Sequence, residues 1–149
     1  MPEYDFKIIN SDEELKEYFK IRNDIFVKEQ NIFPESDIDD YDKDAIHIAA
    51  VQNSTGKMVG AVRCYNTEGD TWVGGRLSAS NGFRNGRVGY NLVRFAVKSV
   101  KARGCTKFLA YVQPQNVKFF KRLDWKPVGE MFSHHGKPHQ LMEADLSKG

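Results

Sequence analysis

Arg84-Asn85-Gly86-Arg87-Val88-Gly89-Tyr90 is the stretch that decides the fold, because it follows a strand-like run and opens a helix-like one. Glycines let the backbone turn and approach a ligand closely, and the free N–H groups at a helix start attract anions. Arg84 and Arg87 add two cationic donors at the same point. The stretch is therefore a candidate phosphate-binding cradle, although a basic turn that contains glycine is also typical of an ordinary solvated loop.

The segments around residues 84–90 alternate between strand and helix patterns. After the cradle, apolar residues recur at helical spacing from Val88 to Arg103, and Gly104 suits the end of that helix. The strands that we expect are Tyr4–Ile9, Ala45–Gln52, Lys57–Tyr65, Trp72–Ala79, Lys107–Val112, Pro127–Met131 and Gln140–Asp145. Two further helices are expected. One starts after a capping box at Ser11 and runs to about Gln30, and the other covers Val117–Leu123.

This order of elements predicts one α/β domain around a central twisted mixed sheet flanked by helices. The 149 residues can bury a substantial core, and no repeat or linker divides them, so we expect a single domain over residues 1–149. The three strands between residues 45 and 79 predict an antiparallel meander.

Composition and charge exclude several classes of function. The 22 basic and 20 acidic residues nearly balance, which gives no support to a nucleic-acid partner, so any anion site must be local. The sequence shows neither a signal-peptide pattern nor an apolar run long enough to span a membrane. Cys64 and Cys105 lie in or beside apolar strand-like runs, as buried free thiols do. We predict a soluble cytoplasmic protein, and the sequence leaves the oligomeric state open between a monomer and a homodimer.

The motifs, in their order along the chain, resemble the GNAT N-acetyltransferases over nearly the whole length. Arg84 and Gly89 match the family's cradle for the pyrophosphate of coenzyme A, whereas Arg87 stands at the usual inner glycine position. A closer likeness, to small bacterial ElaA-type acetyltransferases, is carried by Phe26-Val27-x-Glu29-Gln30, Gly75-Arg76-Leu77 and Gly136-x-Pro138-His139. The C-terminal part is also similar to the acetyltransferase-like domains encoded beside bacterial nitrilases.

The resemblance implies an acyl-CoA N-acyltransferase fold and acetyl-CoA as co-substrate, bound at the ends of strands Trp72–Ala79 and Phe108–Val112. It places the pyrophosphate at residues 84–90 and the pantetheine arm on exposed backbone groups, like an added strand. Apolar Phe119 and Phe120 also fit a core position. The cofactor-binding residues predicted in this way are Leu77, Ser78, Ala79, Arg84, Asn85, Gly86, Arg87, Val88, Gly89, Tyr90, Asn116, Phe119 and Phe120.

Acetyl transfer to a small amine needs a base, because an alkylamine has a pKa near ~10. Glu29 is the first candidate for a base or acceptor anchor, since the resemblance places it on the acceptor side. His47 and His139 are further candidates, because histidine titrates near neutrality. Each of the three also fits a purely structural or solvated role. We expect direct transfer in a ternary complex without a protein nucleophile.

The general acid is less determined by the sequence. Many members of the family have a tyrosine where this chain has Phe120, which cannot donate a proton. The alternatives for the acid are Tyr90, Tyr111, a water molecule or no acid at all. The predicted catalytic residues are therefore Glu29, His47, His139 and Tyr111. The alternative function is an acyl-CoA-binding module with little or no catalysis.

Two features give conflicting predictions of acceptor charge. The acidic run Asp37–Asp42 would attract a cationic amine, or be a solvated charge run. Arg63 and Arg76, on neighbouring strands, would instead favour an acceptor carboxylate. We predict no metal site among His134, His135 and His139, because the ligand set and spacing of known metal sites are absent.

Overall fold

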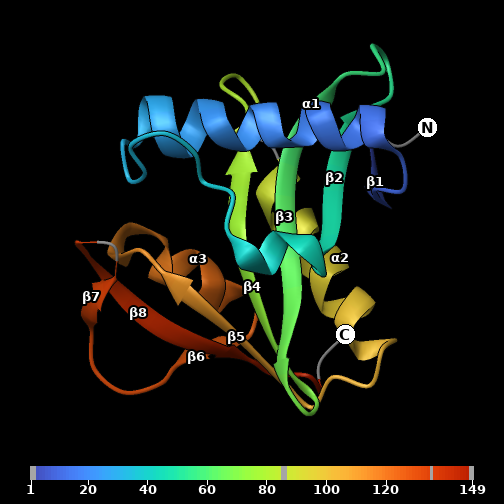
Figure 1. Ribbon diagram of the computed structural model, residues 1–149. Coiled ribbons are helices and arrows are strands. Elements are labelled where there is room, and N and C mark those ends of the chain that lie inside the picture. Colours follow the sequence, from blue (N-terminus) through green and yellow to red (C-terminus); the bar gives the residue numbers. More distant parts are fainter. Residues whose placement is uncertain (1–2, 85–86, 135, 148–149) are drawn as a thin grey trace.

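The computed structural model describes residues 3–84, 87–134 and 136–147. Its elements are β1 (Tyr4–Ile8), α1 (Asp12–Asn23), η1 (Asp24–Glu29), η2 (Asp40–Lys43), β2 (Ile46–Gln52), β3 (Met58–Glu68), β4 (Thr71–Ala79), α2 (Val88–Lys101), β5 (Lys107–Val112), η3 (Pro114–Asn116), α3 (Val117–Arg122), β6 (Trp125–Pro127), β7 (Phe132–His134) and β8 (Lys137–Ala144). Figure 1 shows their arrangement.

Within the described residues, eight strands form one mixed sheet in the order β1-β2-β3-β4-β5-β8-β6, with β7 paired to β8. Strands β1 to β4 are antiparallel neighbours, so the predicted meander is confirmed. Strand β5 joins β4 in parallel after the α2 crossover. Strand β8 then pairs antiparallel with β5, and β6 pairs antiparallel with β8. The predicted mixed α/β architecture is therefore confirmed.

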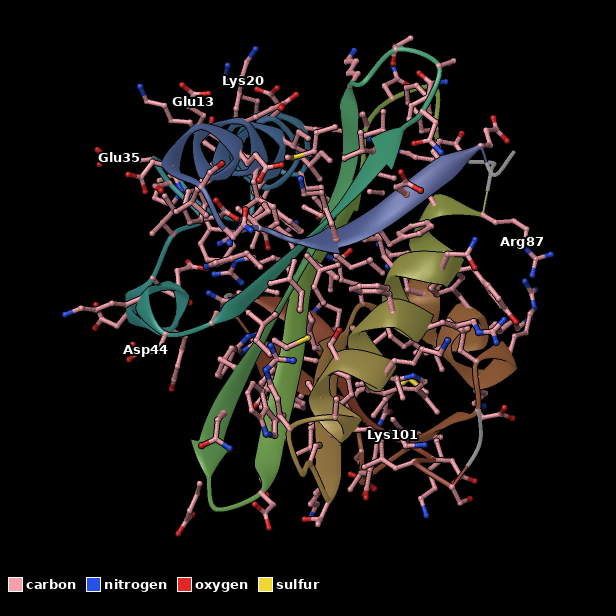
Figure 2. All side chains as sticks on the ribbon, turned by 90° about the vertical axis from the view of Figure 1, so that its right-hand side faces the viewer. Glu13, Lys20, Glu35, Asp44, Arg87 and Lys101 are labelled. Carbon is pink, nitrogen blue, oxygen red and sulfur yellow. The ribbon has the colours of Figure 1, made fainter. Side chains whose placement is uncertain are left out.

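Helices α1 and α2 cover opposite faces of the first half of the sheet (Figures 1 and 2). Because side chains alternate along a strand, β2 contributes to both cores. Ile48 and Ala50 belong to the core beneath α2, where they join Leu92. Ala49 belongs to the second core, with Tyr18 of α1. The apolar stripe of α2 that the sequence predicts thus faces the sheet, and the cradle at the start of α2 lies beside β4.

Two predicted elements differ from the structure. The helix expected to run to about Gln30 changes at Asp24 into the π-helical η1, which leads into the long connection before β2. The strand predicted at Pro127–Met131 is wrong, because β6 ends at Pro127 and Gly129 takes a left-handed φ of 69° that a strand cannot continue. Strand β7 starts only at Phe132.

The cysteine prediction is confirmed, since Cys64 and Cys105 are both buried and free. Burial raises the pKa of the Cys64 thiol to about 12, so it remains a neutral thiol at physiological pH. No helix among the described residues combines the length and the apolar character that a bilayer crossing requires.

Candidate active site

Strands β4 and β5 pair only over their first four residues. Their parallel ladder runs from Thr71–Lys107 to Gly74–Ala110, and no further pair joins them among the described residues. On its other side β4 stays paired with β3, but the register shifts opposite Arg76, whose φ is 54°. This bulge bends β4 away from β5. The backbone of residues 75–79 is therefore left without a β5 partner, and the two strands diverge in Figure 1.

A cavity of about 410 Å³ lies where the two strands part. Its walls come from β3, β4, β5 and α2, from the connection that follows α1, and from the C-terminal strands. Five residues predicted from the sequence line it: Leu77, Tyr111, Asn116, Phe120 and His139. The structure thus brings three of the predicted cofactor-binding residues together with two of the predicted acid–base residues, Tyr111 and His139.

Residues 88–90 of the cradle form the first turn of α2. Arg87 precedes the helix, and its side chain makes no capping hydrogen bond. No acidic residue lies in the first turn, so the N–H groups of Val88, Gly89 and Tyr90 keep the free donors and partial positive charge of a helix start. Figure 2 shows Arg87 at the outer edge of the molecule. Asn85 and Gly86, also predicted to belong to the cradle, lie outside the described residues.

Arg84 ties the cradle to two neighbouring segments. Its Nε donates to the carbonyl oxygen of Ala79 at 2.9 Å, and its guanidinium pairs with the Glu29 carboxylate at 2.8 Å. Both side chains of this ion pair are more than two-fifths exposed. Glu29 does not line the cavity, so the structure places it beside the cradle rather than beside the acid–base residues. Ser78, in contrast, is buried on β4.

Phe119 and Phe120 fill the space between α3, the start of α2 and the cavity. Phe120 is buried and also lines the cavity, whereas Phe119 is partly buried against the same core. A Cβ atom at Gly89 would stand 3.6 Å from Phe119 Cζ, an ordinary contact distance. Gly89 is therefore not required by the packing of the protein itself, and its lack of a side chain leaves open the space beside the helix start that a Cβ atom would take up.

His139 lies on β8, diagonally across from Tyr111 of β5, because Tyr111 pairs with Leu141. The Nδ1 atom of His139 is 3.0 Å from the carbonyl oxygen of Lys137. A carbonyl oxygen only accepts, so this bond fixes the proton of the neutral ring on Nδ1 and leaves a lone pair on Nε2. His139 is buried, yet it lines the cavity. Its second ring nitrogen can thus receive a proton there.

The ring of His134 connects these two side chains. It stacks on Tyr111 with the ring centres 4.7 Å apart and meets His139 edge to face at 5.1 Å. Sequence reasoning considered His134 only as a metal ligand and missed its place in the cavity wall. One signal in the sequence could have revealed it. A strand that begins near Pro138-His139 could pair with a preceding strand through His134.

His47 occupies a different environment. It is buried on β2, with its ring between those of Tyr18 and Phe19, and it does not line the cavity. Its Nε2 donates to the carbonyl oxygen of Asp42 at 2.9 Å. Burial lowers the pKa of His47, so the ring stays neutral and structural at physiological pH.

Three arginines fold the acidic connection back onto the sheet. Arg22 of α1 has no exposed surface and binds Asp37 at 2.6 Å and Asp42 at 2.7 Å. Arg63 of β3 binds both oxygens of Asp39, at 2.5 and 2.9 Å. Arg76 of β4 completes the group, which we call the arginine–aspartate cluster: Arg22, Arg63, Arg76, Asp37, Asp39 and Asp42.

The cluster explains why two sequence features gave opposite predictions of acceptor charge. The acidic run and the arginines neutralise each other, so neither acts on the cavity as an isolated charge. Asp37 and Asp42 are buried, while Glu35 and Asp44 stay on the outside of the connection (Figure 2). The connection is therefore an ordered wall of the site rather than a solvated acidic loop.

The cluster predicts a loss of stability in acid. Although burial acts in the opposite direction, hydrogen bonds from Arg22 lower the pKa of Asp42 from 3.8 to about 2. A carboxyl whose pKa is lowered by folding stabilises the protein above its unfolded pKa, and this contribution disappears as the pH falls through the folded pKa. We expect the Tm to drop by about 5 °C or more between roughly pH 4 and pH 2. Thermal melts of wild type and Asp42→Asn test this, since parallel curves would remove Asp42 from the effect.

The chain matches known proteins along most of its length. Residues 14–125 match the family described as "Acetyltransferase (GNAT) family". The uncharacterized N-acetyltransferase YjcF of Bacillus subtilis is 30% identical over 139 residues, which cover 93% of this chain and 97% of YjcF. Among solved structures, ElaA of Escherichia coli superposes with a TM-score of 0.84 and 23% identity, covering 95% of this chain and 99% of ElaA. An aminoglycoside 6'-N-acetyltransferase solved with coenzyme A has a TM-score of 0.75 and 15% identity, with 95% and 97% of the two chains covered.

Proposed function

Since this chain belongs to the GNAT family of acetyltransferases, we propose that it moves the acetyl group of acetyl-CoA directly to the nitrogen of a small amine. The observation that carries the proposal is the parting of β4 and β5 beside a cavity of about 410 Å³. The unpaired edge of β4 and the side chains of His139 and Tyr111 lie around this space. Helix α2, whose start carries the cradle, contributes Val93 and Ala96 to the same wall.

The residues present fit coenzyme A. The unpaired edge of β4 at residues 75–79 offers backbone N–H and C=O groups to the amide-rich pantetheine arm, as a further strand would. The first turn of α2 offers its N–H groups to the pyrophosphate, and Arg84 and Arg87 supply charge nearby. Bound acetyl-CoA supplies the activated acetyl thioester, and the protein holds and orients it.

His139 serves as the general base. Its Nε2 lone pair takes a proton from the ammonium of the acceptor, which frees the nitrogen lone pair for attack on the thioester carbonyl carbon. A C–N bond then forms, the attacking nitrogen loses its second proton to solvent, and the C–S bond breaks, so the products are the N-acetyl amine and coenzyme A. The proton on His139 passes to solvent when the products leave.

Tyr111 serves as the proton donor to the departing sulfur. Its side chain lines the cavity next to His134, and it takes the role for which Phe120 has no hydroxyl group. The phenol proton goes to the thiolate and is then replaced from solvent. Glu29 supports the cradle through Arg84 in this scheme, and His47 supports the wall of the site through Asp42.

The proposal is tested by incubating the protein with acetyl-CoA and a panel of small amines, and by measuring both the free thiol of coenzyme A and the acetylated product. We expect equal amounts of thiol and N-acetyl product with at least one class of amine. Tight binding of acetyl-CoA without product from any amine would support the acyl-CoA-binding alternative instead.

The cradle assignment predicts that Gly89→Val weakens coenzyme A binding. A side chain at this helix start crowds a phosphate on the N–H groups, so we expect an affinity loss of about tenfold or more. The added Cβ atom meets Phe119 Cζ at an ordinary 3.6 Å, and the Tm reports what the two methyl groups beyond it cost the fold. Calorimetric titration and a thermal melt separate the two effects. Unchanged affinity with an unchanged Tm would place the phosphates elsewhere.

A further inference from the structure

Arg76 stands in the cavity wall in a backbone conformation that arginine rarely adopts. Its φ of 54° lies in the left-handed region, which strains any residue with a Cβ atom. Gly74 and Gly75 come directly before it, yet neither has a positive φ. The strained position thus carries a large charged side chain where glycine would fit without strain. This points to a use for the guanidinium.

One edge of that guanidinium is fixed by the protein. Nε and Nη2 donate to the carbonyl oxygen of Asp37 at 3.0 and 2.9 Å, and Nη2 also reaches Asp39 at 3.2 Å. The group lies over the Phe33 ring, 4.4 Å from its centre. Nη1 makes no hydrogen bond to any described residue, and it is not among the buried atoms that lack a partner. Two preoriented N–H donors therefore remain accessible on a residue that lines the cavity.

Asp39 has no capacity left for an ammonium group. Its Oδ1 accepts from Arg63 at 2.5 Å and from the N–H of Tyr41 at 3.1 Å. Its Oδ2 accepts from Arg63 at 2.9 Å and from Arg76 at 3.2 Å. These four bonds occupy the four lone-pair sites of a carboxylate. The only carboxylate among the described lining residues is thus saturated by the protein's own donors.

The arginine–aspartate cluster is balanced in formal charge, since Arg22, Arg63 and Arg76 are matched by Asp37, Asp39 and Asp42. The preference for an anion therefore comes from the unused Nη1 donors of Arg76 and from the saturation of the Asp39 carboxylate, not from a net charge. Burial and the positive charges of Arg63 and Arg22 lower the pKa of Arg76 to about 10, so it is still protonated at neutral pH. The direction of this shift means that the nearby carboxylates do not fully compensate burial and like-charge repulsion at Arg76.

We propose that the acceptor is an aminocarboxylate, a free amino acid or a close analogue, whose carboxylate accepts hydrogen bonds from Nη1 of Arg76. This inference rests on the proposed acetyl transfer and names the substrate class for it. The rest of the wall on this side is aromatic, with Phe33, Tyr41 and Tyr65, and suits an apolar side chain. An acceptor held by Arg76 on β4 presents its amine to the space that His139 lines from β8.

Matched pairs of ligands test the inference without depending on turnover. Phenylalanine and phenethylamine, and leucine and isopentylamine, differ by the carboxylate alone. Each is titrated calorimetrically into protein saturated with coenzyme A, which lacks an acetyl group to transfer. We expect at least one amino acid to bind about tenfold or more tightly than its decarboxylated partner. In Arg76→Gln that advantage disappears, with a much smaller change for the amine.

Two further variants make the result specific. Arg76→Gly relieves the left-handed strain and should fold, so it must lose the carboxylate preference as well. Arg103→Gln removes an exposed arginine at the far end of α2 and should keep the preference. Three results would each overturn the inference. They are equal binding within each pair, no binding of either amino acid to the coenzyme A complex, and a preference that survives both Arg76 variants. A protein that takes up no coenzyme A would instead contradict the proposed function.

Discussion

His139→Asn lowers kcat by about 10²- to 10⁴-fold and leaves the affinity for coenzyme A unchanged. Asparagine keeps a side-chain N–H near the position of Nδ1, so the bond to the carbonyl oxygen of Lys137 can persist. It removes the Nε2 lone pair, which is the group that takes the proton from the acceptor. Initial rates with a saturating amine, combined with calorimetric titration of coenzyme A, measure the two quantities separately.

His47→Asn is the matched control, because the sequence suggested both histidines as acid–base residues. His47 lies outside the cavity, and its ring holds Asp42 through a backbone carbonyl. We expect this variant to lose about 1–3 kcal/mol of stability, as a buried hydrogen bond and ring packing are removed, and to keep kcat within about twofold. A large loss of kcat in His47→Asn together with normal turnover in His139→Asn would reverse the assignment of the base.

Arg22→Gln lowers the free energy of unfolding by about 3–5 kcal/mol. The change leaves Asp37 and Asp42 buried without the guanidinium that binds them at 2.6 and 2.7 Å. A natural domain has only about 5–15 kcal/mol of stability, so the Tm should fall by about 10 °C or more. Because the Asp42 carboxyl loses the guanidinium that lowers its pKa, it is protonated more readily in the variant, and the deficit should narrow as the pH is lowered. Urea unfolding at two pH values measures both effects.

Lys20→Gln is the control for this effect, since it removes a positive charge two positions earlier on the same helix. Lys20 is exposed and points outward from α1 in Figure 2. Its loss should change the free energy of unfolding by no more than about 0.5 kcal/mol. If Arg22→Gln behaved like Lys20→Gln, the arginine–aspartate cluster would not be the device that holds the connection after η1 against the sheet.

The sequence predicted the elements whose signals are local. The apolar period of residues 88–103 defined α2, and alternating runs between residues 45 and 79 defined the meander, because each pattern lies within one element. The cradle was placed at a helix start by the same kind of signal. The short strands near the C-terminus were harder, since β6 and β7 have only three residues each and a left-handed glycine separates them.

The pairing of distant charges could not be read from the sequence. Arg63 meets Asp39 across 24 positions and Arg76 meets Asp37 across 39, so neither separation carries a periodic signal. Without those pairs, the acidic run and the two arginines looked like competing features of the acceptor site. For the same reason, the sequence could not predict which acid–base candidates lie together. Only the strand register shows that His139 and Tyr111 share a cavity wall while Glu29 and His47 lie elsewhere.

The central claim is that the space between β4 and β5, together with the start of α2, binds acetyl-CoA. Calorimetric titration of the protein with acetyl-CoA, and with coenzyme A, at physiological salt tests it most directly, because salt suppresses loose binding of polyphosphates to basic surfaces. The account predicts one-to-one binding of both with a Kd in the micromolar range, weakened in parallel by Gly89→Val. No measurable binding of either compound would contradict it.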